Sequence, residues 1–275
     1  MNQLLGVELF KIRKRLMTWI LLAVFVGFII LDFMFSYLAV TSLRNGEEFA
    51  FLKNALQFPE AFTMAFSITQ SIGIMMLIIL AAALVGNEYG WGTVNQAISR
   101  QGKRGSYIGA KVVALIITTL FLVLIGLIVG TLLSIFTTSK LAGGLNWDFF
   151  TLSFAGSLIK MFGWTAFTIM AYVLLAMLFA TLGRSVVAGI GGAFGYYFIE
   201  SILVGILDNA SGWVHRIPDY LIGHNMAALV YIERSGHFST TTPPSGLHAT
   251  IVILIYAAVF LGLIFYLFRR QDLTA

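Results

Sequence analysis

The stretch IGAKVVALIITTLFLVLIGLIVGTLLSIF, residues 108–136, decides the fold class of this chain. An α-helix rises about 1.5 Å per residue, so roughly 20 apolar residues cross the hydrocarbon core of a bilayer, which is about 30 Å thick. Five further stretches also reach this length. The six predicted spans are residues 17–40, 62–86, 108–136, 157–182, 186–207 and 249–268. We therefore expect an all-α integral membrane protein with six transmembrane helices, in one domain over residues 1–275.

The composition agrees with a membrane protein. Hydrophobic residues make up 59% of the chain and charged residues 11%, which is far from the balance of a soluble domain. The longest segment between spans, residues 208–248, is too short for a soluble catalytic domain. The chain has no cysteine, which excludes disulfides and thiolate-bound metals.

The distribution of Lys and Arg predicts the orientation in the membrane. One set lies close to span ends: Lys11, Arg13, Lys14, Arg15, Arg100, Lys103, Arg104, Arg184, Arg269 and Arg270. A smaller set lies in the longer loops of the other side: Arg44, Lys53, Lys140, Arg216 and Arg234. This asymmetry favours a multi-pass protein of the cell (inner or plasma) membrane with both termini in the cytoplasm. Lys111 and Lys160 lie inside span ends, where long side chains can reach the interface. A cleaved signal peptide is the alternative for the first span, but its apolar run exceeds a signal core of about 7–15 residues.

The residues before the first span predict an amphipathic helix that lies in the cytoplasmic interface. Leu5, Leu9, Ile12 and Leu16 recur at helical spacing. Charged residues, of which Glu8 is one, occupy the other faces. The alternative is that this segment is simply the start of the first span.

Few polar residues lie inside the predicted spans. Asp32 and Glu200 are the ionisable residues placed well inside, where an unpaired carboxylate is costly and often functional. Tyr196 precedes Glu200 by one helical turn, and Tyr197 and Ser201 flank the same face. A polar stripe on the second span consists of Thr63, Ser67 and Gln70. These residues predict the wall of a transport path formed by Ser67, Gln70, Tyr196, Tyr197 and Glu200. The alternatives are a hydrogen-bonded structural carboxylate at Glu200 and interhelical hydrogen bonds for the stripe.

Two glycine pairs predict close helix packing. Gly126 with Gly130, and Gly191 with Gly195, are each four residues apart, as in small-xxx-small motifs. We expect contacts within one subunit, with a seam between two subunits as the alternative.

The chain lacks the motifs of several enzyme classes. It has no HExxH, no GxSxG and no P-loop, so it cannot hydrolyse ATP by a P-loop of its own. The four histidines have no zinc-site spacing. We therefore predict a non-catalytic protein without a metal site.

The segment 87–104, between the second and third spans, is the most distinctive part of the chain. It begins with a carboxylate, continues through a glycine-flanked tryptophan and a stretch able to form two helical turns at 93–99, and ends in basic residues. Such a compact cytoplasmic segment is suited to transmit force to or from a partner. The alternative is a loop that only sets the topology.

This segment resembles the corresponding loop of ABC-2-type transporter permeases. The matching residues are Glu88-Tyr89-x-x-Gly92-Thr93, then Ser99-Arg100, and Lys111 at the start of the next span. The proline that usually follows this arginine is missing, and either Lys103 or Arg104 takes the later basic position. The chain ends also resemble the family, with Glu8 and Lys11 before the first span and Phe268-Arg-Arg-Gln-Asp272-Leu273 at the end.

The resemblance implies the membrane subunit of an ATP-binding-cassette exporter with a G-subfamily-like fold. Relatives combine two permease subunits, as a homodimer or a heterodimer, with two cytoplasmic ABC ATPase subunits that bind ATP and Mg. The loop after the second span forms a coupling helix that docks on the ATPase, and short re-entrant helices precede the last span. By position, the ATPase-coupling residues are Glu88, Tyr89, Gly92, Thr93, Arg100, Lys103 and Arg104. The substrate cavity lies mainly between the second and fifth spans, and the apolar interior suits an amphipathic or hydrophobic substrate such as a peptide, antibiotic or lipid.

Two other classes stay open at this point. An ion-coupled secondary transporter would use Asp32 and Glu200 as ion or proton sites. A membrane sensor or assembly protein would need no ATPase at all.

Overall fold

The computed structural model describes residues 2–42, 47–92, 104–144, 147–207, 212–232 and 244–270. Throughout this part of the chain the ordered elements are helices, and no strand occurs. The elements are α1 (Asn2–Lys14), α2 (Leu16–Ser42), α3 (Glu47–Ala55), α4 (Glu60–Gly90), α6 (Arg104–Ala142), α7 (Leu152–Leu182), α8 (Val186–Leu207), η1 (Gly212–Arg216), η2 (Pro218–Tyr220), α9 (Ile222–Ile232) and α10 (Gly246–Arg270).

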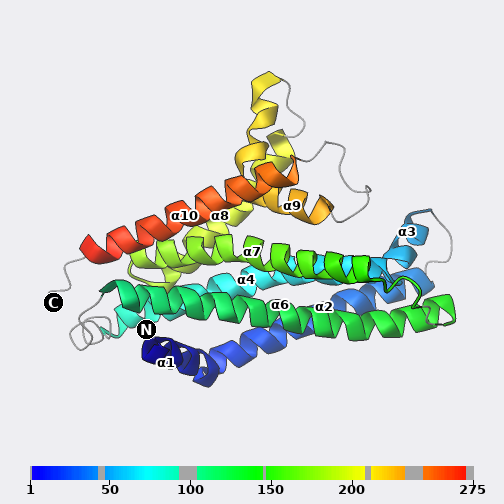
Figure 1. Ribbon diagram of the computed structural model, residues 1–275, viewed down its shortest axis with the longest axis horizontal. Helices are drawn as coiled ribbons and strands as arrows, with labels where there is room; N and C mark the ends of the chain where they lie inside the picture. Colours follow the sequence, from blue (N-terminus) through cyan, green and yellow to red (C-terminus); the bar gives the residue numbers. More distant parts are fainter. Residues whose placement is uncertain are drawn as a thin grey trace.

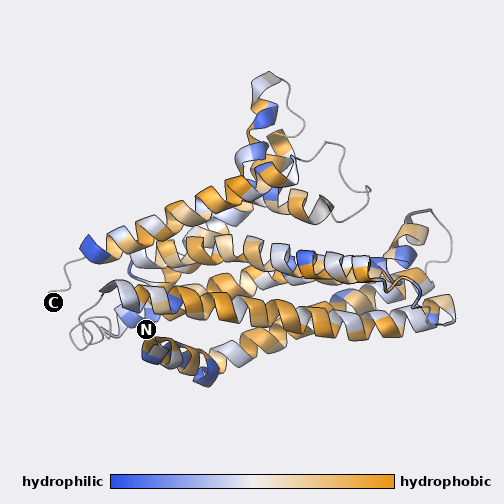
Figure 2. Cartoon of the chain, in the orientation of Figure 1, coloured by the Kyte–Doolittle hydropathy of each residue, from blue (hydrophilic) through white to orange (hydrophobic). Residues whose placement is uncertain are grey.

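Six of these helices are long and apolar enough to cross a membrane: α2, α4, α6, α7, α8 and α10. Each contains one of the six predicted spans, so the prediction of an all-α protein with six membrane-spanning helices is confirmed. Apolar residues line most of their length, and hydrophilic residues gather mainly near helix ends (Figure 2). The chain is a multi-pass membrane protein by these criteria.

The helices α4 and α7 form the centre of the bundle. They are the most enclosed of the six, whereas α2 and α8 have mostly exposed surfaces. The helices α2, α4, α6 and α7 run along the long axis of the molecule, and α8, α9 and α10 lie along one side (Figure 1). The N-terminus lies near the end of α4 and the beginning of α6, so α1 is positioned beside the segment that joins these two helices.

Close packing of α6 on α4 depends on the first glycine pair. A Cβ atom on Gly126 would lie 2.2 Å from Thr69 Oγ1, and one on Gly130 would lie 2.4 Å from Ala65 Cβ. These distances leave no room for a side chain, so the expected packing within one subunit is confirmed for this pair.

The second glycine pair does not pack in this way. No described atom lies within 4 Å of a Cβ built on Gly191 or Gly195, so the expected contact within the subunit is wrong for them. Their neighbours on α8 make the contact instead: Gly189 faces Ala82, and Gly192 faces the ring of Phe179. The glycines with small-xxx-small spacing therefore lie on the open face of α8, and Gly189 and Gly192 lie on its packed face.

The N-terminal segment is a helix, but its faces differ from the expected pattern. Leu5 and Leu9 pack against the core and Ile12 is buried. Leu16 is exposed, because α1 ends at Lys14 and Leu16 begins α2 in a new direction. Glu8, expected on a polar face, is buried as well, and its partners are described below.

The region before the last span contains the short helices η1, η2 and α9, and α9 packs against α10 and α7. The buried Asn225 holds the turn between η2 and α9, since its Nδ2 donates to the carbonyl oxygens of Asp219 at 2.7 Å and Leu221 at 2.8 Å. The short helix α3 between the first two spans was not predicted.

Candidate functional site

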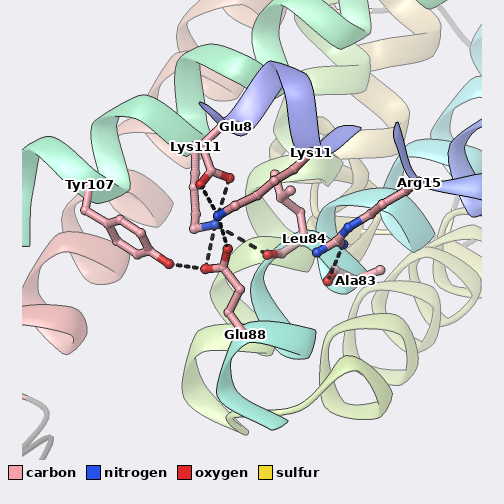
Figure 3. Close-up of polar contacts among 8 residues, drawn as sticks. All are labelled: Glu8, Lys11, Arg15, Ala83, Leu84, Glu88, Tyr107 and Lys111. Carbon is pink, nitrogen blue, oxygen red and sulfur yellow. Dashed lines mark hydrogen bonds and ion pairs between the residues drawn. The ribbon is translucent and has the colours of Figure 1, made fainter. Parts of the chain in front are cut away.

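Four charged side chains from three helices meet beside the end of α4 (Figure 3). They are Glu8 and Lys11 of α1, Glu88 of α4 and Lys111 of α6. The Lys11 Nζ atom lies 2.8 Å from Glu8 Oε1 and 2.8 Å from Glu88 Oε1. The Lys111 Nζ atom lies 2.9 Å from Glu8 Oε2 and 2.7 Å from Glu88 Oε2. Each carboxylate thus contacts both ammonium groups, and we call these four residues the charge cluster.

The charge cluster is enclosed by protein. The side chain of Lys111 is 1% exposed, and those of Glu8 and Glu88 are 3% and 4% exposed. The side chain of Lys11 is 35% exposed and lies at the outward-facing side of the cluster. Burying a single ion costs several kcal/mol, about as much as its partner can return. Two positive and two negative groups in alternation leave no net charge, which explains why all four can be held inside.

Hydrogen bonds and an aromatic stack extend the cluster to a fourth helix. The hydroxyl of Tyr107 donates to Glu88 Oε2. The Tyr107 ring stacks on the Phe268 ring of α10, with ring centroids 5.7 Å apart. The Lys111 ammonium lies 4.9 Å from the centroid of the Tyr107 ring. The cluster thereby connects α1, α4 and α6 directly, and α10 through Tyr107.

Lys11 and Glu8 both belong to α1 and lie outside the membrane-spanning helices. Burial lowers the pKa of Lys11, but hydrogen bonds and ion pairs with Glu8 and Glu88 outweigh burial and raise the pKa above its usual value. Lys11 is therefore charged throughout the physiological range.

The last turn of α4 is fixed next to the cluster. The Trp91 N–H donates to the Asn87 carbonyl at 2.9 Å, and Gly92 then adopts a left-handed conformation with φ of 65°. Arg15 holds this end from the other side. Its Nη1 donates to the Ala83 carbonyl at 3.1 Å, and its guanidinium lies 5.7 Å from the Trp91 ring. The end of α4 is thus attached to the α1–α2 joint.

The predicted coupling residues divide into three groups. Glu88 lies inside the cluster, Tyr89 packs partly against the core, and Gly92 lies just beyond the end of α4 in a left-handed conformation. Arg104 begins α6, and its side chain is not described. Thr93, Arg100 and Lys103, together with the helix expected at 93–99, lie outside the described residues.

The expectation that Lys111 reaches the membrane interface is wrong. Its side chain points into the bundle, because Glu8 and Glu88 supply two counter-charges there. Lys160, the other lysine with this expectation, is exposed.

A third buried carboxylate, outside the charge cluster, lies toward the end of α8. Glu200 is 3% exposed, and it accepts hydrogen bonds from the Tyr172 hydroxyl at 2.8 Å and from the Gly223 N–H at 2.5 Å. The Tyr172 ring contacts Tyr197 at 5.4 Å and Tyr196 at 6.5 Å between centroids. Glu200 therefore joins α8 to α7 and α9, and this geometry supports the structural alternative over the transport path.

The other polar residues of the predicted path are also placed. Gln70 Nε2 donates to Thr168 Oγ1 at 2.7 Å in a buried contact between α4 and α7, which supports the interhelical alternative. Ser67 is half-buried, and its carbonyl accepts from the Ser71 hydroxyl at 3.0 Å. Asp32 is exposed on α2.

Three residues of these sites were not found from the sequence. Tyr107 carries a usable signal, because it lies four residues before Lys111 on the same face of α6. Tyr172 and Gly223 carry no such local signal, since they reach Glu200 only through the packing of α7 and α9 on α8.

A family model described as "Protein of unknown function (DUF2705)" matches residues 19–274. A search of curated proteins finds no match to the chain. Because the family model covers nearly the whole sequence, the chain belongs to the DUF2705 family.

Proposed function

We propose that this protein is the membrane-spanning subunit of an ABC exporter for amphipathic or hydrophobic substrates, driven by a separate cytoplasmic ATPase. The observation that carries the proposal is the charge cluster, which joins three helices where α4 leads into the segment 93–103. The six membrane-spanning helices and the resemblance of Glu88-Tyr89-x-x-Gly92-Thr93 to ABC-2-type permeases support it.

The charge cluster is suited to transmit movement. Removing one partner from a buried ion pair costs about 3–5 kcal/mol, so its members resist separation. A force on the segment 93–103 acts on the end of α4, and the cluster passes it to α1 and α6. In the proposed mechanism, closure of the ATPases would move these helices together and switch access to the substrate cavity.

The roles of the coupling residues differ in this proposal. Glu88 is enclosed and serves as a positioning residue, whereas the basic residues Arg100, Lys103 and Arg104 contact the ATPase, which binds ATP and Mg. Trp91 is 66% exposed at the same end of α4 and is available for that contact. Thr93 begins the proposed coupling helix.

The exposed helices support a second permease subunit, as a homodimer or a heterodimer. Asp32 lies on the exposed surface of α2, between Phe28 and Phe35, which are also exposed. A carboxylate that faces hydrocarbon at a helix centre costs about 2.5–3.5 kcal/mol, and such residues normally face protein or water. The open glycines Gly191 and Gly195 on α8 allow a second close approach.

The substrate path in this proposal uses the half-buried members of the predicted set. Ser67, Tyr196 and Tyr197 keep part of their surface open. Gln70 and Glu200 hold neighbouring helices and position that wall. The re-entrant course of the short helices η1, η2 and α9 is part of the same proposal.

The proposed orientation can be tested with single cysteines, since the chain has none of its own. We expect Ser239→Cys to react with a membrane-impermeant maleimide in intact cells and Ser99→Cys to react only after lysis. The reason is the excess of basic residues on the side that holds residue 99. Reaction at position 99 in intact cells would overturn the cytoplasmic location of the coupling segment.

The exporter proposal predicts a partner-dependent ATPase. We expect the purified chain to hydrolyse no ATP and to co-purify with an ABC ATPase whose activity drives substrate transport in proteoliposomes. Arg100→Ala should lower transport about tenfold, which corresponds to roughly 1.4 kcal/mol of coupling free energy within the usual range of about 1–3 kcal/mol. Lys53→Ala, on the exposed surface of α3 at the opposite end of the bundle, is the matched control.

A membrane sensor would give a different result. In that case no ABC ATPase would co-purify, and Arg100→Ala would leave substrate movement unchanged. If Arg100→Ala and Lys53→Ala both transported substrate at the rate of the unmodified protein, the coupling role of Arg100 would likewise be contradicted.

A further inference from the structure

An apolar cavity lies between α1, α2, α4 and α6. Its volume is about 350 Å³, within the range of about 300–1,000 Å³ that is usual for small-molecule sites. Its walls include Leu9 and Ile12 of α1, Trp19 of α2, Leu77 of α4 and Leu122 of α6. Nearly all of the lining is hydrocarbon, which suits an acyl chain and gives a polar metabolite almost no hydrogen-bonding partners.

Three polar residues line the same cavity, Arg13, Thr18 and Thr118, and the Thr118 hydroxyl already donates to the Ala114 carbonyl at 2.8 Å. Arg13 is exposed near the end of α1, close to where the chain turns into α2. The Thr18 hydroxyl is buried and has no hydrogen-bond partner among the described residues. A buried hydroxyl without a partner is unfavourable, and a hydrogen bond to an added acceptor would relieve this cost. The indole of Trp19 is held at this place, because its Nε1 donates to the Arg13 carbonyl at 2.8 Å.

We propose that this cavity binds one anionic phospholipid of the cytoplasmic leaflet. An acyl chain would fill the apolar cavity, an ester carbonyl would accept the hydrogen bond of Thr18, and the phosphate would lie against Arg13. The site combines a cation, a hydroxyl donor and a hydrocarbon wall, as the parts of a phospholipid require. Its position at the α1–α2 joint agrees with the cytoplasmic placement of the basic N-terminal segment, where anionic lipids concentrate.

The bound lipid would stabilise the docking of α1. The helix α1 contributes Leu9 and Ile12 to the cavity and Glu8 and Lys11 to the charge cluster. One short helix is thus held by both sites, and lipid binding would favour the same position of α1 as the ion pairs do. This inference depends on the membrane location and the proposed orientation of the chain, and not on the proposed exporter function.

The test compares two lipids with the same acyl chains. The full chain, purified in detergent, is titrated with dioleoyl phosphatidylglycerol or dioleoyl phosphatidylcholine, and bound lipid is counted by native mass spectrometry. We expect one phosphatidylglycerol per chain at low lipid and weaker retention of phosphatidylcholine. Glycerol phosphate, which lacks acyl chains, should not bind.

Variants separate a built site from general attraction to basic residues. Arg13→Gln should weaken phosphatidylglycerol binding about fivefold, the usual effect of one basic residue near an anionic membrane. Lys14→Gln removes the same charge from the neighbouring exposed position, outside the cavity, and should have little effect. Thr18→Val, which keeps the side-chain shape, should weaken the binding of both lipids. Equal binding of the two lipids by the unmodified chain, or equal losses in Arg13→Gln and Lys14→Gln, would overturn the proposal.

Discussion

Replacement of Lys111 by methionine is expected to lower the free energy of unfolding by about 3–5 kcal/mol. The substitution keeps the length and apolar stem of the side chain but removes its charge. Glu8 and Glu88 would then share the single ammonium of Lys11, and one buried negative charge would be left without a partner. Thermal or denaturant-induced unfolding of the purified protein in detergent measures the loss.

The control is Lys160→Met, which removes an exposed lysine from α7 and should change stability by less than about 0.5 kcal/mol. A second variant tests the cause. Glu8→Gln combined with Lys111→Met leaves the neutral pair of Lys11 and Glu88, so the double variant should lose less than the sum of the two single losses. Additive losses, or equal stability of Lys111→Met and Lys160→Met, would contradict a coupled charge cluster.

Replacement of Glu200 by leucine is expected to lower stability by about 1–3 kcal/mol for each donor that it leaves buried without an acceptor. These donors are the Tyr172 hydroxyl and the Gly223 N–H. Because Gly223 belongs to α9, the loss should also loosen this helix from the bundle. Unfolding measurements together with hydrogen exchange of the residues in α9 would show both effects.

Three further variants define the role of Glu200. Tyr172→Phe removes one donor and should cost less than Glu200→Leu, whereas Ser201→Ala changes the exposed neighbour and should be neutral. Glu200→Gln keeps an acceptor oxygen and should retain most of the stability. A Glu200→Gln complex that is fully stable but responds abnormally to substrate would favour the transport-path alternative over the structural role.

The six spans could be predicted because their signal is local. A span needs only length and continuous apolarity, and both are visible in a stretch such as residues 108–136. The packing of Gly126 on Thr69 was within reach for the same reason, since spacing along one helix marks a smooth face. The identical spacing of Gly191 and Gly195 failed, because spacing does not indicate which neighbour, if any, covers that face.

The charge cluster could be predicted from the sequence only in part. Glu8, Lys11, Glu88 and Lys111 each stood in a recognisable motif, but the pairs join residues as far as 103 positions apart. Helical periodicity separates apolar faces from polar ones, and it therefore placed Glu8 on the polar side of α1. Only the approach of α6 makes that position an interior one, where Glu8 meets Lys111.

The same separation along the chain sets an order during protein synthesis. Glu8 and Lys11 leave the ribosome before the other two members of the charge cluster, and Lys111 follows 103 positions after Glu8. At about 5–20 residues per second, this interval amounts to roughly 5–20 s. During that time two membrane-spanning helices have been made, while Glu8 still lacks one of its two ammonium partners. Full docking of α1 must therefore wait until the beginning of α6 has been made, although α7, α8, α9 and α10 are made later still.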